Sequence, residues 1–576
     1  MQAEPPRHPC WPPGVPERIA VPDQTLWQGL AARAQADPDG TGLVFLGRLY
    51  SWAQLAGEAE RLAGALQGLG IEPGARVVLF MQNCPQYVIG FHAILRAGAV
   101  AVPLNPMNKA VELTQYLADA DATVVIASSD IAAEVAAAAA GQPSQSSLRH
   151  LVVFDLADGL PNDIGAASSQ WPDSWRPWLL GRDPRPVSTV LSVHDWDSLV
   201  ARAPVPRAVP AAGADLAAMP YTSGTTGTPK GCMHSHATML HNALTAGPWL
   251  GQREGDTVLI AVPMFHVTGL VMGMLAAIQW GCRMVVLPRW DARQAARAIE
   301  QYEVTHWPNI PTMVIDLLAN PDAAGHSLQS LRYIGGGGAP MPAAVAEELR
   351  RRTGLSYVEG YGLTETAAPS HTNPRQAVRL GSMGIPYIGV EALVIDLDTL
   401  QPLASGEVGE IVVRGPQVFL GYWRQPRATA EAFVDIAGRR FFRTGDLGRV
   451  DADGYFHLAD RLKRMINASG FKVWPAEVEG ILHRHPAVQQ ACVIASRHPY
   501  RGETVKAVVV LQPAYRDRMT PEELVDWARQ EMSAYKYPRT IEFADSLPRS
   551  ATGKVLWRQL QRRQDELDAQ QNPGET

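Results

Sequence analysis

Short, continuous apolar runs alternate with helical segments through much of the chain. ARVVLFMQNC and ATVVIAS are bounded by turn residues, and helical segments such as PQYVIGFHAILRAG lie between such runs. A run that is apolar at nearly every position suits a buried strand of a parallel sheet. The alternation continues in DTVLIAVPMF, RMVVLP, THWPNI and LRYIGGGGAP. This pattern predicts an α/β core with parallel sheets.

Three stretches depart from this alternation. Between Asp158 and Ala214 the pattern gives way to Pro, Ser, Gly, Asp and Trp, which predicts a long surface insertion and leaves short helices open. From Glu391 the sequence becomes strand-rich, and VDADGYFHL predicts a hairpin with Asp-Gly in its turn. After Arg461 a small unit begins, with helices in AEVEGILHRHPAV and TPEELVDWARQEMSAY and strands in QACVIAS and VKAVVVLQ.

A chain of 576 residues is too long for one hydrophobic core, so more than one domain is expected. We predict a large N-terminal domain, residues 1–460, with parallel βαβ-type sheets and a β-rich end. A small, mobile α+β domain, residues 461–576, is predicted to follow it, and we expect its last dozen polar residues to be frayed.

Charge and cysteine usage exclude several classes of protein. The net charge is 51 − 57 = −6, which gives no reason to expect nucleic acid or an anionic membrane as partner. The five cysteines form no CxxC pair, so neither a disulfide framework nor a zinc site is expected, and a cytoplasmic location fits best. The N-terminus lacks the apolar region of a signal peptide, and the apolar stretch 267–278 is too short to span a bilayer. Peripheral membrane contact and a homodimer are left open.

The segment YTSGTTGTPKG, Tyr221 to Gly231, carries the strongest chemical signal. Its glycines allow the backbone to approach a phosphate, its hydroxyls can donate to phosphate oxygens, and Lys230 supplies a mobile positive charge. It is not a Walker loop, because Pro229 stands where that pattern requires glycine before the lysine. A flexible Ser/Thr/Gly surface loop is the alternative.

Further segments follow in order: GGGGAP (335–340), EGYGLTET (359–366), RTGDLG (443–448) and LPRSATGKVLW (547–557). Together with YTSGTTGTPKG they resemble the adenylate-forming enzymes, which include acyl-CoA synthetases, firefly luciferase and peptide-synthetase adenylation domains. The likeness runs from about Trp27 to Trp557 and is greatest to fatty acid–CoA ligases. It implies that a carboxylic acid is activated with ATP and Mg2+ as acyl-AMP and then transferred to coenzyme A, with release of pyrophosphate and AMP.

The resemblance assigns roles to single residues. Glu365 would hold Mg2+, for which a hard carboxylate is suited, and Lys554 would stabilise the transition state of adenylation. Thr226 and His266 complete the implied catalytic set. The implied nucleotide contacts are Thr222, Ser223, Gly224, Thr225, Thr226, Gly227, Lys230, Gly336, Gly337, Gly338, Ala339, Glu359, Gly360, Tyr361, Gly362, Thr364, Asp446, Arg461 and Lys463. Taken alone, EGYGLTET could be a strand–turn–helix junction, and Lys554 a solvated lysine after a glycine turn.

For the second step, the resemblance implies that the small domain rotates about residues 460–463 so that Lys554 leaves and the thiol of coenzyme A enters. The segment ASGF, residues 468–471, is the expected wall for pantetheine. Two positions depart from the family pattern: Asn467 stands where some relatives have lysine, and Trp557 stands where the last signature often ends in a basic residue.

The acid itself is predicted from the segment MFHVTGLVMGM. It has no aspartate to pair with an amino group, which disfavours amino acids. His266 matches a position that gates the acyl pocket, and Val267 and Leu270 belong to a flexible apolar stripe suited to an alkyl chain, although such a stripe is also typical of helix core. We predict a medium- to long-chain fatty acid. Aryl or cinnamic-type acids, transfer to a carrier protein, and nucleotide binding without turnover are the alternatives.

Overall fold

A computed structural model describes residues 8–143, 145–164, 168, 171–222, 229–461, 464–468, 471–498, 502–516, 518–533, 535–549 and 555–571. The chain forms two compact units. The first comprises Met1–Ala392 and Val413–Phe442, and the second comprises Leu393–Val412 and Arg443–Thr576. The domains predicted from the sequence, residues 1–460 and 461–576, remain a prediction.

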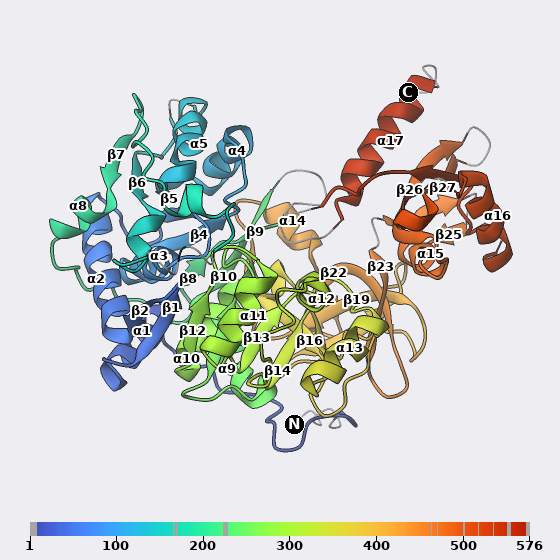
Figure 1. Ribbon diagram of the computed structural model, residues 1–576, viewed down its shortest axis with the longest axis horizontal. Helices are drawn as coiled ribbons and strands as arrows, with labels where there is room; N and C mark the ends of the chain where they lie inside the picture. The colour runs from blue at the N-terminus through green and yellow to red at the C-terminus, as the bar shows by residue number, and fades with distance from the viewer. Residues whose placement is uncertain are drawn as a thin grey trace. The chain divides into compact units, whose positions relative to one another are not determined.

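The first unit contains two nine-stranded sheets, here named the first sheet and the second sheet (Figure 1). The first sheet is parallel from β15 to β1, as the apolar runs predicted. Helices α11 (Ala292–Gln301), α12 (Pro311–Ala319) and α13 (Ala343–Thr353) share one apolar core with it, around the buried Trp307. In spatial order its strands are β17 (Ile385–Pro386), β16 (Ala368–Thr372), β15 (Val358–Leu363), β14 (Tyr333–Gly336), β13 (His306–Asn309), β11 (Thr257–Ile260), β12 (Arg283–Val286), β1 (Thr41–Phe45) and β2 (Arg48–Ser51).

The second sheet has a parallel centre and an antiparallel edge. Helices α4 (Ala110–Ala120) and α5 (Ser129–Ala140) pack on the apolar side chains of its central strands. Helices α1 (Leu26–Ala36), α2 (Trp52–Gly68) and α3 (Pro85–Arg96) belong to the same unit. In spatial order its strands are β20 (Gly421–Tyr422), β10 (Lys230–Ser235), β8 (Leu216–Ala218), β4 (Val100–Leu104), β3 (Arg76–Phe80), β5 (Ala122–Ser128), β6 (His150–Phe154) and β7 (Ser192–Asp195), with β9 (Tyr221–Thr222) paired to β10.

The segment predicted as a surface insertion is only partly that. It contains the short helices α7 (Arg176–Leu179) and α8 (Trp196–Ala201), which the sequence left open, and strand β7, which it did not predict. Strand β7 pairs in parallel with β6, and Trp171, Trp175 and Trp196 are buried. The strand SVHD is four residues long and half exposed, so its hydropathy does not stand out from the surrounding loop.

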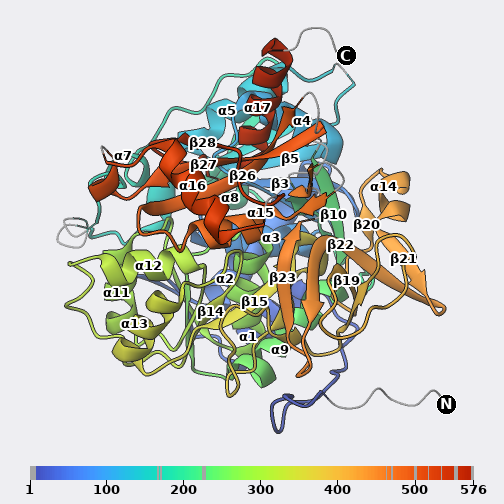
Figure 2. The same cartoon turned by 90° about the vertical axis from the view of Figure 1, so that its right-hand side faces the viewer.

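A third, five-stranded sheet has the order β18 (Glu391–Ile395), β19 (Gly409–Arg414), β22 (Arg439–Val450) and β21 (Phe433–Ile436), with β23 (Phe456–Arg461) paired to β22. Strands β22 and β23 are neighbours in Figure 2, where both are orange. They form the hairpin predicted from VDADGYFHL, and Gly454 in its turn has a φ of 84°. A left-handed φ of this kind is the conformation for which glycine is preferred in such turns.

The second unit contains a sheet with helices on both faces, in agreement with the α+β character predicted for this part of the chain. Helices α15 (Pro475–Leu482) and α16 (Pro521–Glu531) pack on one face through Val478, Leu482 and Leu524. Helix α17 (Trp557–Gln571) contributes Leu560 to a separate apolar cluster with Cys492 and Val508. The strands are β25 (Phe471–Val473), β24 (Ile466–Ala468), β27 (Gly502–Leu511) and β26 (Val488–His498), with β28 (Thr540–Phe543) parallel to β27.

The prediction of a frayed polar tail is wrong for the end of α17. Asp568 is only 6% exposed, and it accepts a hydrogen bond of 2.7 Å from the backbone N–H of Arg497. Gln564 accepts one of 2.7 Å from the ammonium of Lys506. Polar side chains that are buried with their hydrogen bonds satisfied look like solvent-facing ones in a hydropathy pattern, which explains the error.

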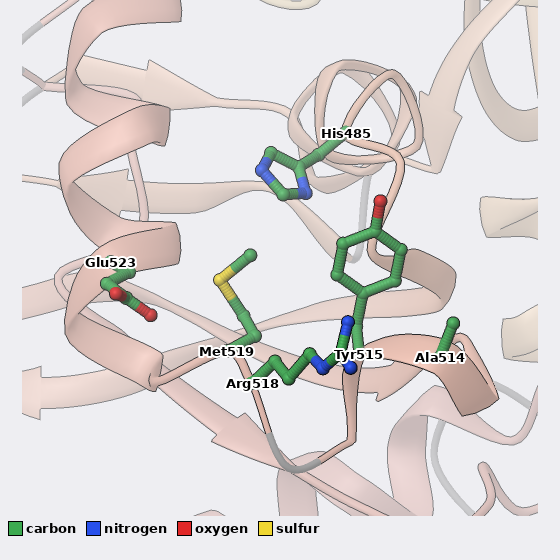
Figure 3. Close-up of a pocket in the computed structure, with 6 residues that line it drawn as sticks. All are labelled: His485, Ala514, Tyr515, Arg518, Met519 and Glu523. Atoms are coloured by element: carbon green, nitrogen blue, oxygen red, sulfur yellow. The ribbon is translucent and has the colours of Figure 1, made fainter.

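The surface of the second unit is hollowed between the end of α15 and the start of α16, over a volume of about 430 Å³ (Figure 3). His485 and Met519 line it, together with Ala514, Tyr515, Arg518 and Glu523. Glu523 is engaged in capping α16, since its carboxylate accepts from the N–H of Thr520 at 2.8 Å. None of the residues that the sequence assigned to the site lines this hollow.

Within the described ranges, no helix has the length and apolar character needed to cross a bilayer.

Candidate active site

The two ends of the glycine-rich segment are strands β9 and β10, paired to each other. Thr222 lies opposite Lys230, and Tyr221 lies opposite Gly231. The antiparallel pairing therefore brings the two ends of the glycine-rich segment together, with Lys230 as the first residue of β10. Five of the residues predicted to bind phosphate lie outside the described part of the chain: Ser223, Gly224, Thr225, Thr226 and Gly227.

Strand β9 is anchored to helix α4. The hydroxyl of Tyr221 donates to the carboxylate of Asp119 at 2.6 Å, and the ring of Tyr221 meets that of Tyr116 edge-on with centroids 5.0 Å apart. The indole N–H of Trp423 donates to the carbonyl of Asp119 at 3.1 Å. Burial raises the pKa of Asp119 and, together with that carboxylate, the pKa of Tyr221. One acidic residue thus secures both β9 and the chain after β20.

Lys230 on β10 and Tyr422 on β20 lie at the edge of the second sheet, and Tyr422 contacts Glu365, which follows β15 of the first sheet. The ammonium of Lys230 lies 4.8 Å from the centre of the Tyr422 ring, and the Tyr422 hydroxyl donates to Oε1 of Glu365 at 2.8 Å. Burial, and then the charge of Glu365, raises the pKa of Tyr422 far above its usual value, so the phenol remains a donor. Within the described ranges Lys230 forms no ion pair with a carboxylate.

Three residues, Phe419, His234 and Asn242, hold the segment that carries Glu365 through hydrogen bonds to its backbone. The backbone N–H of Phe419 donates to the carbonyl of Glu365 at 2.8 Å. Nε2 of His234 bonds the carbonyl of Thr364 at 2.8 Å, and burial lowers the pKa of His234 to about 4, so the ring is neutral and donates. The amide of Asn242 donates to three carbonyls, those of Thr366, Ala367 and Pro369. Two residues in this turn have a positive φ: Ala367 (49°) and Ala368 (85°).

GGGGAP and EGYGLTET come from adjacent parallel strands. Gly335 pairs with Val358, and Gly336 pairs with Glu359, so both segments lie at the carboxyl edge of the first sheet. This is the edge where α/β sheets commonly bind ligands.

The glycines of these two segments are required by close backbone contacts. A Cβ on Gly337 would lie 2.1 Å from the carbonyl oxygen of Gly360, and one on Gly362 would lie 1.9 Å from that of Ala368. A Cβ on Gly336 would lie equally close to the carbonyl oxygen of Asn309. Gly338 has a φ of 94°. Gly338 and Ala339 are exposed.

Glu359 and Tyr361 hold neighbouring parts of the chain. The buried carboxylate of Glu359 accepts from the N–H groups of Met341 and Gly381, each at 2.8 Å, while burial raises its pKa. It ties the loop after β14 to the segment before β17. The ring of Tyr361 lies with its centroid 5.8 Å from that of His371. The predicted nucleotide contacts of Glu359, Gly360 and Tyr361 remain predictions.

His266 lies two residues before a π-helix that runs from Thr268 to Leu275. Its Nδ1 accepts from the N–H of Thr268 at 3.3 Å, and its carbonyl accepts from the N–H of Leu270 at 2.9 Å. Val267 and Leu270 are buried, at 2% and 0% exposure. A π-helix costs stability relative to an α-helix and is frequent at functional sites.

The predicted ribose contacts lie in the second unit. Asp446 is 2% exposed on β22, and its strand partner on β23 is Arg461. The neighbouring Thr444 hydroxyl accepts from the N–H of Asp446 and donates to the carbonyl of Ile411 at 2.6 Å. Lys463, Lys554 and residues 469–470 of the ASGF segment lie outside the described part of the chain.

Sequence reasoning missed the supporting residues Asp119, His234, Asn242 and Tyr422. His234 lies 130 positions from Thr364, and Asn242 lies 124 positions from Thr366. No local pattern links partners at such separations. The position of His234 inside a strand, on the same side as Cys232, gives no sign of its function.

The residues present fit a nucleotide with a bound divalent cation. Across the part of the chain that is described, no group of three or more His, Cys, Asp or Glu side chains could hold a metal ion by itself. A single carboxylate such as Glu365 suits Mg2+, which usually takes one or two carboxylates and shares phosphate oxygens. The five cysteines form no disulfide, and Cys232 is buried with a raised pKa, as expected for a packing role.

Comparison with known proteins agrees with this geometry. Residues 30–423 match the model of the family described as AMP-binding enzyme, and residues 477–554 match the AMP-binding enzyme C-terminal domain. A long-chain-fatty-acid–CoA ligase of Bacillus subtilis is 34% identical over 97% of this chain and 98% of its own. A feruloyl-CoA synthase of an Amycolatopsis species is 35% identical over 93% of this chain and 99% of its own.

A solved structure, ATP-bound MatB from Rhodopseudomonas palustris, superposes with a TM-score of 0.81 at 28% identity, over 95% of this chain and 100% of that one. The α/β fold predicted from the sequence, with sheets in a large N-terminal part and a smaller C-terminal part, is thereby confirmed. The chain therefore belongs to the AMP-binding enzyme family, and within it to the AMP-forming acyl-CoA synthetases.

Proposed function

We propose that the protein activates a medium- to long-chain fatty acid with ATP and transfers the acyl group to coenzyme A. The observation that carries the proposal is the array of Lys230, Tyr422 and Glu365 beside the glycine-rich hairpin. It brings a cation, a carboxylate and the two ends of a phosphate-binding segment to one edge of the second sheet. Acyl-CoA ligase activity is common to the relatives, whereas the acid differs among them.

In this proposal the first unit binds the triphosphate and the adenine. Lys230 and the hydroxyls and amides of residues 222–227 would bind the β- and γ-phosphates. Bound to Glu365, Mg2+ would neutralise phosphate charge. The adenine would be bordered by Tyr361 and by Gly336, Gly337, Gly338 and Ala339. The α-phosphate would be bound by Thr364, and the ribose by Asp446 and Arg461.

The first reaction requires positioning more than a protein nucleophile. An oxygen of the carboxylate attacks the α-phosphorus, the bond to the bridging oxygen of pyrophosphate breaks, and acyl-AMP forms. Lys554 would donate to the oxygens that gain charge, an effect worth about 3–4 kcal/mol for one well-placed donor. The buried Cys232, whose pKa is raised, has no part in this step.

In the second reaction the thiolate of coenzyme A attacks the acyl carbonyl and AMP leaves. The proposal includes a rotation of residues 461–576 about residues 460–463, which would remove Lys554 and admit the thiol beside residues 468–471. A cytoplasmic location and a homodimer belong to the same set of predictions; four of the five free cysteines are buried, which is compatible with a reducing compartment.

The acid is proposed from the surroundings of His266. The π-helix that follows it is built from apolar residues and carries no aspartate for an amino group. The relative from Bacillus subtilis is named for long-chain fatty acids. The feruloyl-CoA synthase, similar over almost the whole chain, favours an aryl acid as the second candidate.

A panel of acids tests the proposal. Fatty acids from C2 to C18, benzoate, cinnamate and ferulate are each assayed for ATP–pyrophosphate exchange and for AMP release with coenzyme A. The proposal predicts the highest kcat/KM for an acid of about C10 to C18. A maximum at ferulate or cinnamate would replace the fatty acid by the aryl acid, and exchange without any CoA-dependent AMP release would favour a carrier-protein acceptor.

A further inference from the structure

Tyr422 is held rigidly at the edge of the second sheet. It pairs with Cys232 across β10 and β20, and its backbone N–H donates to the hydroxyl of Thr429 at 2.9 Å. Its ring meets that of Phe419 edge-on, with centroids 4.8 Å apart. Before it, Gly421 has a φ of 146°, and a Cβ there would lie 2.6 Å from Thr429. The backbone and the ring are therefore fixed before any ligand binds.

This rigid side chain contacts both charged groups of the array. The hydroxyl donates to Oε1 of Glu365, and the face of the ring lies 4.8 Å from the ammonium of Lys230. A hydroxyl donor restricts the orientation of the carboxylate, while the ring offers the ammonium a neutral partner in place of a carboxylate. Among the described residues, Lys230 thus has this neutral partner and no ion pair that would compete with a phosphate.

We infer that Tyr422 is a positioning residue that sets the Glu365 carboxylate for a divalent cation and keeps the Lys230 ammonium available to a polyphosphate. The inference rests on the proposed function, because it takes these two residues as the nucleotide–metal contacts. Residues that orient a ligating carboxylate commonly change metal affinity by 10- to 100-fold when they are removed. The hydroxyl and the ring are expected to act separately, the first on the cation and the second on the anion.

Two variants separate the two contacts. Tyr422→Phe keeps the ring and removes the hydroxyl, whereas Tyr422→Leu removes both. Binding of α,β-methylene-ATP, which cannot be adenylated, is measured by calorimetry without Mg2+ and along a Mg2+ titration. Tyr50→Phe is the matched control, because its buried hydroxyl donates to the carbonyl of Gly159 at 3.1 Å and touches neither Glu365 nor Lys230.

For Tyr422→Phe we expect the Mg2+ concentration at half-maximal binding to rise about tenfold, with Mg2+-free binding unchanged. Tyr422→Leu should show the same rise and, in addition, Mg2+-free binding weakened by about fivefold, since the ammonium loses the ring. In the background of Glu365→Gln, Tyr422→Phe should have no further effect on the Mg2+ midpoint. Tyr50→Phe should leave both quantities unchanged.

An unchanged Mg2+ midpoint in Tyr422→Phe overturns the inference, as does an equal shift in Tyr50→Phe, which would indicate a general loss of stability. An additive effect of Tyr422→Phe and Glu365→Gln also overturns it. The binding measurement does not require an acid. If wild-type protein binds the analogue but none of the acids in the panel gives ATP–pyrophosphate exchange, the proposed function is refuted and the Tyr422 result still stands. If wild-type protein fails to bind the analogue at all, both proposals fall.

Discussion

The first and second sheets share an architecture, with parallel central strands covered by helices, but differ in the use of polar residues at their carboxyl edges. In the second sheet, Asn83 after β3 bonds the backbone of Val262 and Met264, and Asp155 after β6 pairs with Arg185 at 2.8 Å. These polar groups are fully engaged within the protein. In the first sheet, by contrast, strand β14 leads into the exposed Gly338, and the exposed Gly362 lies near the end of β15.

The second sheet contributes to the proposed site through its antiparallel edge, where β10 carries Lys230 and β20 carries Tyr422. Topology alone would place a site at the carboxyl ends of both sheets. The difference teaches that the proposed site lies where small residues, such as Gly338 and Gly362, leave the carboxyl edge of the first sheet open.

The largest effect should come from the charged group at the edge of the second sheet. Lys230→Ala should lower acid-dependent ATP–pyrophosphate exchange by 100-fold or more, because a preorganised charge near a developing anion is worth roughly 3 kcal/mol. Lys109→Ala is the matched control: this lysine belongs to the same sheet's helical layer, is 76% exposed and pairs with Glu134. An equal loss of exchange activity in both variants would contradict the distinction between the edge of the second sheet and the helices that cover it.

A good part of this contrast could be predicted from the sequence. The apolar runs predicted the parallel strands of both sheets, because burial on both faces requires side chains that are apolar at every position. YTSGTTGTPKG and EGYGLTET identified the segments around Lys230 and Glu365, since their glycines and hydroxyls are unusually dense.

The remainder depended on contacts between distant residues. Tyr422 reaches Glu365 across 57 positions, and Trp423 reaches Asp119 across 304, so neither pair leaves a local signal. Strand β7 was missed because it is short and partly exposed, and the buried end of α17 was missed because its polar residues are paired with partners elsewhere in the chain. Hydropathy patterns report burial of apolar groups and cannot show burial of satisfied polar ones.

The second prediction compares two glycines. Gly337→Ala should raise the KM for ATP about tenfold and lower Tm by several degrees, because its Cβ would lie 2.1 Å from the carbonyl oxygen of Gly360 in β15. Gly57→Ala, in helix α2, should instead stabilise the protein by about 0.5–1 kcal/mol, since only the tip of Arg61 comes within 3.7 Å. Kinetics and thermal unfolding of both variants check this. A tolerated Gly337→Ala would mean that the carboxyl edge of the first sheet is not tightly packed.

The smallest effect concerns His92 in helix α3, beside the second sheet. It is fully buried, Nδ1 bonds the carbonyl of Val88 at 2.8 Å, and Nε2 meets no partner within the described ranges. Burial lowers its pKa to about 4 from 6.5. Between pH 6.5 and about 4, the unfolded chain therefore binds a proton at His92 that the folded chain does not bind. The free energy of unfolding is unaffected by this group above pH 6.5 and falls as the pH is lowered towards 4.

Replacing this group should flatten the acid side of the stability curve without affecting the active site. For His92→Leu, the loss of unfolding free energy between pH 7 and pH 5 should be smaller than in the wild type by roughly 1–2 kcal/mol. Urea denaturation at both pH values measures it, with His326→Gln, a surface histidine paired with Glu300, as the control. Exchange activity per folded molecule should stay the same at pH 7. A fall in that activity would couple the helices of the second sheet to catalysis and would narrow the difference between the two sheets.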